Sequence, residues 1–571
     1  MTAIGALGRR KATSLAYYAM VAPVVALFGF MLVWPLLDIV LRSLNERGRA
    51  SLGDGLFWGH YLALATDSLL RQVVLHSLML AALATVITAL LAFPTAYIIS
   101  RLPRQISSVV MITILMPFWV SIIVRLFAFT TILGQQGIIN SALSLIGLGP
   151  YPLLYNTFAT TVGMVAYLIP YLVLILTSAM QSVDSSLLTA ARTMGASERA
   201  IFLDVYFPQV RPALFSGCVL VFVLALGFFL TPAILGGPSD LTIPIFIQQQ
   251  VQIYQWGKAA AMGIVLLVAS LVGYMLALKV GGRGILSPAE HGVRGAGAAE
   301  ELKFTPAMIV CCIAMAFVLL VQVAPLLVVL PTAFTETTQI RFPPVGFSWR
   351  WFVEVITSED WRRAFLKSVR IGVMVAILST LLGLSLARGG TRMRSLFARS
   401  AIQIIAIAPL VVPVIMLAIG IFDVQARIGL IDSDVGLVLA HSLLCVPLTF
   451  LVLGNALSII DISMEQASWT MGAGHMRTFW SIIVPQLIPG IIGSLTISFV
   501  TSWDETVISM FQTQLSKTLP VTVYSLMRSG ITPAVSAVSA IVITPVLLGT
   551  LVFGVWSYRK SITRNRQVSH S

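Results

Sequence analysis

"ARTMGASERAIFLDVYFPQ" (Ala191–Gln209) and "SWTMGAGHMRTFWSIIVPQ" (Ser468–Gln486) are two copies of one polar pattern in a chain that is otherwise mostly apolar. Each copy contains Thr-Met-Gly-Ala and ends in Pro-Gln. Gly472 follows Gly195 by 277 positions (472 − 195 = 277), and Pro208 and Pro485 keep the same offset. The sequence therefore contains an internal duplication.

The composition around these copies is that of a membrane protein. Of 571 residues, 58% are hydrophobic and 10% are charged, whereas soluble domains carry about 25% charged residues. A bilayer core takes about 20 apolar helical residues, and by that rule we expect an all-α polytopic membrane protein with about twelve spans. The expected spans are 15–41, 73–100, 107–134, 157–180, 213–235, 257–279, 304–332, 367–388, 397–424, 435–457, 490–512 and 532–557.

The positive charges indicate how the spans are oriented. The net charge is +14, but Lys and Arg gather in short segments between apolar runs, which is the distribution of cytoplasmic loops rather than of a nucleic-acid-binding face. We expect both termini in the cytoplasm. Six expected spans separate the two copies, so both copies lie on the cytoplasmic side and the duplication is parallel.

A Gly- and Ala-rich segment separates the two halves. Residues 281–303, "GGRGILSPAEHGVRGAGAAEELK", have no helical periodicity long enough to pack and are typical of a flexible linker. We therefore expect one six-span half over residues 1–280, a cytoplasmic linker over 281–303 and a second half over 304–571.

The repeated pattern predicts a turn and a bend at the same places in each half. Gly195 and Gly472 suit a turn that a Cβ would strain. Pro208 and Pro485 should end a short amphipathic helix and bend the chain into the next span, which would leave that helix along the cytoplasmic face. A loop that only re-enters the membrane explains one copy; two copies with the same turn residues favour paired docking surfaces for a partner with two-fold symmetry.

These residues resemble the EAA motif of MetI-like permeases in ATP-binding-cassette importers, which runs Glu-Ala-Ala, three residues, Gly, nine residues, then Ile-x-Leu-Pro. The Gly-to-Pro spacing is kept in both copies. The signature Glu is replaced by Thr189 and Gln466, with Glu465 one position earlier, so the role of that carboxylate is in doubt here. The matching residues are Ala190, Ala191, Gly195, Ala196 and Pro208, and Ala467, Gly472, Ala473 and Pro485.

Further segments are similar to the two permease subunits of spermidine/putrescine-type importers. "PFWVSIIVRLFAF" (117–129), "PLLYN" (152–156) and "GFFLTPAILGG" (227–237) resemble the first subunit. "SWDETVISMF" (502–511) and "TLPVTVYSLMRSGITPAVSAVSA" (518–540) resemble the second. The resemblance implies two MetI-like permeases fused in one chain of a bacterial inner membrane.

The same resemblance implies partners and an energy source. Each EAA loop would be a coupling helix seated on one of two copies of an ABC ATPase, and a periplasmic or lipoprotein solute-binding protein would deliver the solute. The chain has no G-x-x-x-x-G-K-[ST] stretch, so it cannot cradle ATP phosphates itself. We expect a transport component that is not an enzyme and that binds no cofactor, with ATP on the partner.

Ionisable side chains within spans are candidate solute contacts, because they are costly there and usually face a cavity or a partner. Asp504 and Glu505 adjoin Trp503, and carboxylates beside an indole suit an ammonium group, with a cation–π contact of ~0.5–2 kcal/mol. The alternative is an internal ion pair with Arg125. Asp423 is a weaker candidate. Trp119, Phe228 and Tyr254 would line an opposite wall, although core packing explains each singly, and His441 is expected to be a packed neutral histidine.

Other functions remain open from the sequence alone. Relatives of this shape carry other small solutes, such as an amino-phosphonate, an opine or ferric iron. A secondary transporter driven by an ion gradient is also commonly built from two six-span halves, but it would need more intramembrane carboxylates. A non-transporting membrane scaffold is the third possibility.

Overall fold

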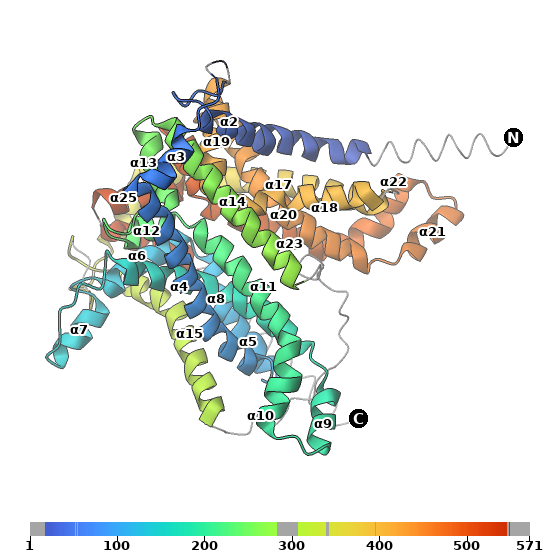
Figure 1. The fold of residues 1–571 in the computed structure, drawn as a ribbon, viewed down its shortest axis with the longest axis horizontal. Helices are drawn as coiled ribbons and strands as arrows, with labels where there is room; N and C mark the ends of the chain where they lie inside the picture. Colours follow the sequence, from blue (N-terminus) through green and yellow to red (C-terminus); the bar gives the residue numbers. More distant parts are fainter. Residues whose placement is uncertain are drawn as a thin grey trace. The chain divides into compact units, whose positions relative to one another are not determined.

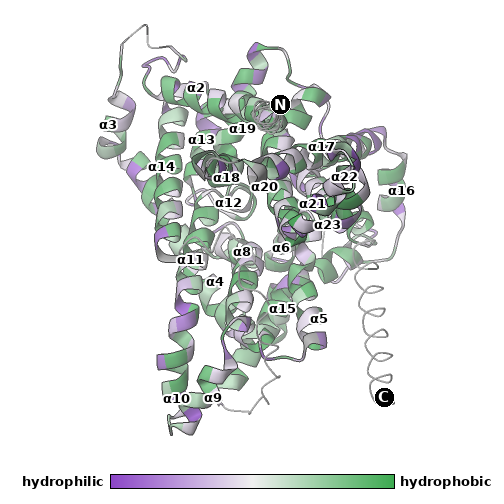
Figure 2. Cartoon of the chain, turned by 90° about the vertical axis from the view of Figure 1, so that its right-hand side faces the viewer, coloured by the Kyte–Doolittle hydropathy of each residue, from purple (hydrophilic) through white to green (hydrophobic). Residues whose placement is uncertain are grey.

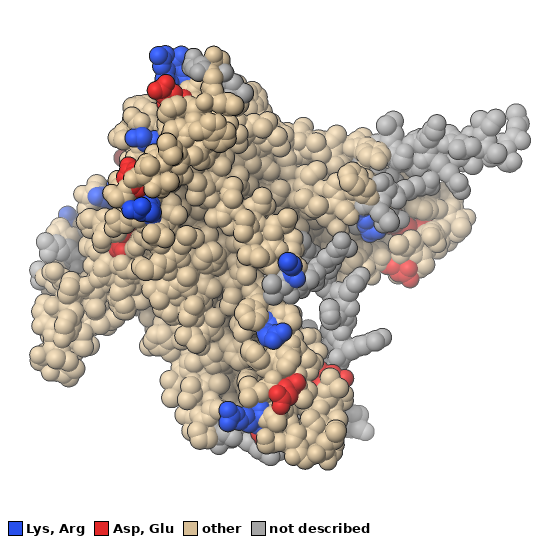
Figure 3. Space-filling model, in the orientation of Figure 1, with Lys and Arg blue, Asp and Glu red and all other residues tan. Residues whose placement is uncertain are grey.

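The computed structural model describes residues 18–51, 53, 55–281, 306–338, 342–393, 396–530, 532–544 and 548. Its regular structure is helical, and no strand occurs among those residues (Figure 1). Hydrophobic residues cover most of the long helices (Figure 2), and the face shown in Figure 3 is largely uncharged. The principal helices are α2 (Trp34–Ser43), α4 (Ser68–Ile99), α5 (Arg104–Leu115), α6 (Ile122–Leu133), α7 (Ile138–Leu145), α8 (Thr157–Gln181), α9 (Ser185–Thr193), α10 (Glu198–Ala200), α11 (Phe207–Leu226), α12 (Leu230–Leu235), α13 (Ile243–Gln252), α14 (Trp256–Gly281), α15 (Pro306–Thr332), α17 (Glu359–Arg392), α18 (Leu396–Val411), α19 (Val414–Arg427), α20 (Asp434–Ile459), α21 (Ile462–Thr470), α22 (His475–Thr478), α23 (Val484–Asp504), α24 (Val507–Gln512) and α25 (Leu519–Ser529).

The described residues contain fewer spanning helices than the twelve expected. Ten helices are long and apolar enough to cross a membrane, or up to eleven if one bent pair is a single span. The all-helical, polytopic architecture is thus confirmed, and the number is corrected to 10–11 within the described residues. The expected last span, 532–557, is described only at residues 532–544 and 548, and residues 282–303 of the expected linker lie outside the described residues.

Two expected continuous spans, 107–134 and 397–424, are wrong because the backbone breaks inside them. The first divides into α5, a 3₁₀ turn at Met116–Trp119, and α6. The second divides into helices 397–411 and 414–427, bent by 96°. Pro117 lies in the 3₁₀ turn and Pro413 is the N-cap of α19; proline lacks a backbone donor and disfavours helix in the residue before it.

Two more expected spans, 213–235 and 490–512, end earlier than their apolar runs. α11 ends at Leu226 and α12 follows as a separate short helix, and α23 ends at Asp504 before α24. These four helices repeat at the offset of 277 found in the sequence: α11 corresponds to α23 and α12 to α24. The internal duplication is therefore visible in the structure, including its breaks.

The chain folds into two compact units, and neither unit is one half of the sequence. Unit 1 is Met1–His60, Tyr254–Leu267 and Asp360–Thr522; unit 2 is Tyr61–Ile253, Val268–Glu359 and Val523–Ser571. In unit 1, α2 packs against α19, and in unit 2, α15 packs against α4, α6 and α8. The first long helix of each half thus packs with spans of the other half. The boundaries expected at residues 281–303 stay a prediction.

Each unit has its own apolar core. In unit 1, Met31 near the start of the chain packs in one cluster with Met416 and Leu417 of α19 and Ile508 of α24. In unit 2, α8 lies along α4 and buries Leu168, Leu172 and Leu176. α11 packs against α4 and α8 in unit 2, and α23 packs against α20 in unit 1.

Candidate functional site

The repeated pattern begins, in both copies, with a helix capped by an aspartate. Asp184 precedes α9 and accepts a hydrogen bond from the Ser186 N–H, and Asp461 precedes α21 and accepts one from the Ser463 N–H, both at 2.8 Å. These hydrogen bonds hold the pKa of each carboxyl below its usual value of 3.8, because they stabilise the charged form. The two helices therefore start in the same way.

Both helices end in the turn that the glycines predict. Gly195 has φ +82° and Gly472 has φ +85°, in the left-handed region that favours glycine. In the first copy the Ala196 N–H donates to the Ala191 carbonyl and the Gly195 N–H to the Arg192 carbonyl. The second copy has the same two bonds, Ala473 to Ser468 and Gly472 to Trp469. Each turn is a Schellman motif.

The prolines do not end a helix, so the expected short second helix that stops at Pro208 or Pro485 is wrong. Helices 198–226 and 475–504 are each continuous through the proline. A π-helical turn precedes each proline, at Ile201–Tyr206 and Phe479–Ile483. A wider turn of this kind accommodates a residue without a backbone donor. α9 and α21 are then the short helices that the two copies present (Figure 1).

The two loops expose methionines at equivalent positions. Met194 is 87% exposed and Met471 is 80% exposed, and each directly precedes the left-handed glycine. Met476 and Trp480 are also exposed in the second copy. Flexible apolar side chains on an exposed turn are suited to contact with a protein partner. We call these two segments, residues 184–200 and 461–477, the coupling loops.

The coupling loops differ in how charges hold them. In the first, Arg192 and Glu198 form an exposed ion pair at 3.0 Å. In the second, Glu465 is 4% exposed and pairs with Arg388 of α17 at 3.8 Å, and the Arg388 guanidinium lies 4.8 Å from the Phe479 ring. In the second copy, no carboxylate replaces the missing motif glutamate. Gln466 stands at that position and is exposed, and the neighbouring Glu465 is buried. Sequence reasoning noted Glu465 but missed Arg388.

The acidic pair lies at a break between helices rather than within a span. Asp504 is the last residue of α23, and Glu505 follows it. Glu505 is buried, and its Oε1 accepts a hydrogen bond from the Ile508 N–H at 2.7 Å. Trp503 stacks on Phe499 with ring centroids 5.9 Å apart. Glu505 thus holds the first turn of α24, and Trp503 is fixed by a neighbouring ring.

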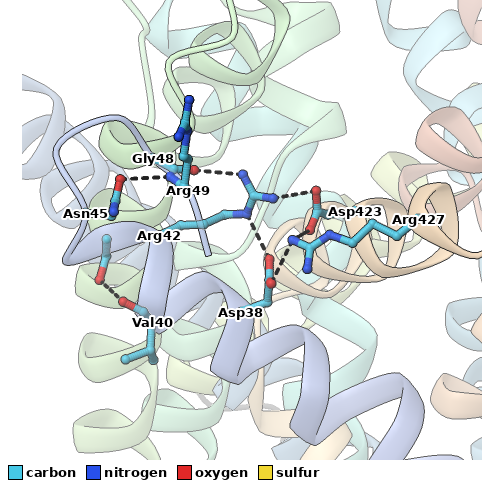
Figure 4. A network of polar contacts seen from close by, with 9 residues as sticks. Asp38, Val40, Arg42, Asn45, Gly48, Arg49, Asp423 and Arg427 are labelled. Atoms are coloured by element: carbon cyan, nitrogen blue, oxygen red, sulfur yellow. Dashed lines mark hydrogen bonds and ion pairs between the residues drawn. The ribbon is translucent and has the colours of Figure 1, made fainter. Parts of the chain in front are cut away.

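Asp423 lies in a network of two carboxylates and two guanidinium groups in unit 1 (Figure 4). Arg42 bonds Asp38 at 2.8 Å and Asp423 at 2.7 Å. Arg427 bonds Asp38 at 2.8 Å and also pairs with Asp423. The network joins α2 to α19, and Asp423 has structural partners that the sequence did not predict. Its assignment as a solute contact stays a prediction.

The other candidate residues are spread over both units. Tyr254 belongs to unit 1 and is exposed, with φ +60°. Trp119 and Phe228 belong to unit 2; Trp119 is exposed at the end of the 3₁₀ turn, and Phe228 meets Tyr167 edge-on at 5.0 Å. Their expected role as one wall of a solute path stays a prediction. The pairing of Arg125 in unit 2 with Asp504 or Glu505 in unit 1 also stays a prediction.

His441 is a packed residue, as expected. It is buried in α20, with Ser502 Oγ 2.8 Å from its Nδ1 and Ser509 Oγ 2.9 Å from its Nε2. Both ring nitrogens therefore have hydroxyl partners, one on α23 and one on α24. The histidine ties together the two helices on either side of the acidic pair.

Comparison with known proteins identifies the duplicated unit. Residues 89–281 and 379–560 match the family described as binding-protein-dependent transport system inner membrane component. The spermidine/putrescine transport system permease protein PotB of Salmonella typhimurium (strain SL1344) is 30% identical over 259 residues, 44% of this chain and 90% of PotB. PotC of Haemophilus influenzae (strain ATCC 51907 / DSM 11121 / KW20 / Rd), a permease protein of the same kind of system, is 29% identical over 201 residues, 35% of this chain and 77% of PotC.

Among solved structures, a chain from a bacterial alginate ABC transporter in complex with an alginate-bound periplasmic protein covers 48% of this chain and 96% of its own, at 19% identity and a TM-score of 0.41. That score is too low to compare the folds in detail. The two family matches cover more than half of the chain, and such permeases are non-catalytic, multi-pass inner-membrane subunits that work with a separate ATPase and a solute-binding protein. The chain belongs to the binding-protein-dependent transport system inner membrane component family, with two copies of the domain in one polypeptide.

Proposed function

We propose that this permease imports a polyamine, such as putrescine or spermidine, or a closely related small organic cation. The observation that carries the proposal is the 30% identity to PotB over 90% of PotB's length. The similarity to PotC of the same kind of system supports it. In this proposal the chain unites the roles of both permease subunits, with residues 1–280 and 304–571 as the two halves.

The two coupling loops dock on two copies of an ABC ATPase. This docking is supported by the geometry that the two loops share: the same aspartate cap, the same Schellman turn and an exposed methionine before each glycine. Equal ATPase subunits present equal grooves, so two equivalent loops suit them. Ala190, Ala191 and Ala196 in the first loop, and Ala467 and Ala473 in the second, shape these surfaces. Pro208 and Pro485 lie in the long helices that follow the loops. Both loops and both termini then lie in the cytoplasm.

The solute passes Trp503, Asp504 and Glu505. A break between two helices exposes backbone carbonyls as well as carboxylates, and both groups stabilise an ammonium ion at membrane depth. Asp423 lies on α19, which packs against α24, the helix that Glu505 caps. Trp119 and Phe228 in unit 2 and Tyr254 in unit 1 are further candidate solute contacts, each within its own unit, since aromatic faces attract organic cations.

Reconstitution into liposomes with the ATPase and the solute-binding protein tests this function. We expect ATP-dependent uptake of radiolabelled putrescine or spermidine, and no uptake when ATP or the ATPase is omitted. An ionophore that collapses ion gradients should leave the rate unchanged. Uptake that follows the ion gradient and ignores ATP would contradict the proposal, and so would a complex that hydrolyses ATP in response to a different solute only.

A further inference from the structure

A small cavity lies in unit 2 between α6, α8 and α15, and the proposed polyamine path makes no use of it. Arg125 of α6, Tyr167 and Gly163 of α8, and Gln322 and Pro325 of α15 are among its lining residues. α6 and α8 belong to the first half of the sequence and α15 to the second. The cavity has room for about one water-sized group, so it does not hold a whole polyamine.

Arg125 brings a buried positive charge to this cavity. The side chain is buried, with 6% of the residue exposed, and its Nε has no hydrogen-bond partner in the described structure. In the described part of unit 2, no ion pair joins it to a carboxylate. Its guanidinium carbon lies 5.0 Å from the centroid of the Tyr167 ring, which offsets only part of the cost of burying a cation. A buried arginine in a membrane span needs a counter-ion.

The remaining lining adds no negative charge. The Gln322 amide donates to the Ala166 carbonyl at 3.0 Å and so is held in one orientation. The Tyr167 hydroxyl is 3.3 Å from the hydroxyl of Tyr171. None of the residues that line the cavity is acidic. An ammonium group would be repelled here, whereas an anion would meet a guanidinium with an unused donor.

We propose that this cavity is an anion-binding site, in which Arg125 holds one small monovalent anion: either a free halide or the carboxylate of a solute. The anion neutralises Arg125 and, through it, stabilises the packing of α6 against α8 and α15. The site follows from the cavity, the burial and the unpartnered Nε. It stands whether the imported solute is a polyamine or another molecule.

Direct binding to the wild-type complex in lipid nanodiscs tests the site. Equilibrium dialysis with radiolabelled chloride, and separately with radiolabelled butyrate, should show about one saturable anion per chain in a buffer whose other anion is divalent sulfate. Saturable chloride with no butyrate identifies the halide, and saturable butyrate identifies a carboxylate; either supports the proposal. Butylammonium, which has the same chain as butyrate with the opposite charge, should not displace the anion. If neither anion binds saturably, the proposal is overturned.

Variants assign the binding to Arg125. Arg125→Gln should lose the saturable anion, and Arg125→Lys, which keeps the charge, should retain it with weaker affinity. Arg101→Gln is the matched control, since Arg101 also lies over tyrosine rings, and it should bind the anion as the wild type does. Two results would overturn the assignment. One is undiminished binding in a folded Arg125→Gln variant, and the other is an equal loss of binding in Arg125→Gln and Arg101→Gln. Putrescine uptake is measured separately, so failure of the anion site does not count against the polyamine proposal.

Discussion

Arg388 and Glu465 form an ion pair that fastens the second coupling loop to α17, with 3.8 Å between the arginine Nη1 and the glutamate Oε1. Both side chains are largely buried. The first coupling loop has Leu188 at the position that corresponds to Glu465, and Leu188 is also buried. One loop is therefore held by charge and the other by apolar packing.

Glu465→Gln should loosen the second coupling loop and reduce solute-stimulated ATP hydrolysis. The variant removes the carboxylate that Arg388 has at 3.8 Å, at a cost of about 1–3 kcal/mol. The measurement is the thermal unfolding midpoint of the complex together with its ATPase rate. Glu198→Gln is the matched control, because Glu198 pairs with Arg192 while 71% of its side chain is exposed, and exposed pairs contribute little. Equal effects of the two variants would contradict this role for Arg388.

Gly195→Val and Gly472→Val should each uncouple transport from ATP hydrolysis while the chain still inserts in the membrane. A β-branched residue at φ +82° or +85° is strained by about 1–2 kcal/mol, so each turn must change shape. A Cβ at either glycine meets no atom within 4 Å, and the backbone angle alone carries the effect.

The control for these variants is Gly454→Val in α20. Gly454 also has open space around it, but it has ordinary helical geometry. We expect near-normal uptake for Gly454→Val and a loss of at least several-fold for the other two variants. Normal uptake in both loop variants would show that the turns are not docking surfaces.

Asp184→Ala should fray the start of α9, whereas Asp184→Asn should preserve it. The carboxylate accepts the Ser186 N–H, and an asparagine oxygen replaces it in this role. Because folding lowers the pKa of this carboxyl, the stability that its negative charge adds to the cap is fully present above the usual value and is lost as the pH falls through the lowered value. At neutral pH, hydrogen–deuterium exchange in the first turn of α9 should be faster in the alanine variant only. Unchanged exchange in that variant would contradict the capping role.

Asp38→Asn should destabilise unit 1 more than Asp423→Asn does. Both aspartates pair with Arg42 and Arg427, but the side chain of Asp38 is 3% exposed and that of Asp423 is 14% exposed, so the charge of Asp38 is screened less by solvent. We expect a loss of about 3–5 kcal/mol for Asp38→Asn, as when one partner of a buried pair is removed, measured as a lower unfolding midpoint. The Asp423→Asn variant separates two roles of Asp423. If the role is structural, the variant lowers the unfolding midpoint and leaves the KM for putrescine unchanged. If Asp423 contacts the solute, the variant raises the KM. Equal midpoints for wild type and Asp38→Asn would contradict the network's importance.

The sequence predicted the turns at Gly195 and Gly472 because their signal is local. A glycine that ends a helix acts on its own neighbours, and the duplication shows the same pattern twice. The breaks at Pro117 and Pro413 were missed, since apolar runs continue across them and hydropathy does not report backbone geometry. The partners of Asp423 were missed for another reason: Arg42 lies 381 residues away, and no periodicity links positions so distant.

The sequence also did not predict that helices from both halves pack together within each unit. The helix Tyr18–Ser43, which ends in α2, and α15 have the length and hydropathy of ordinary spans, and these properties carry no information about which neighbour a helix packs against. Only the folded structure assigns α2 to the unit that contains α19 and α15 to the unit that contains α4. The count of 10–11 within the described residues differs from the expected twelve at two places: 397–424 is a bent pair of helices, and 532–557 is only partly described.

Glu505 combines a charge with a cap, and substitutions can separate these two properties. Its carboxylate accepts the Ile508 N–H at the start of α24; a glutamine keeps that acceptor but loses the charge, and an alanine loses both. If the acidic pair binds an ammonium group, Glu505→Gln and Asp504→Asn should each raise the KM for putrescine about tenfold, since one charge-assisted hydrogen bond contributes about 1.5–3 kcal/mol. Glu505→Ala should in addition lower the unfolding midpoint. Initial uptake rates in proteoliposomes give the KM. A Glu505→Gln variant with an unchanged KM would leave Glu505 as a structural cap and move the solute path elsewhere.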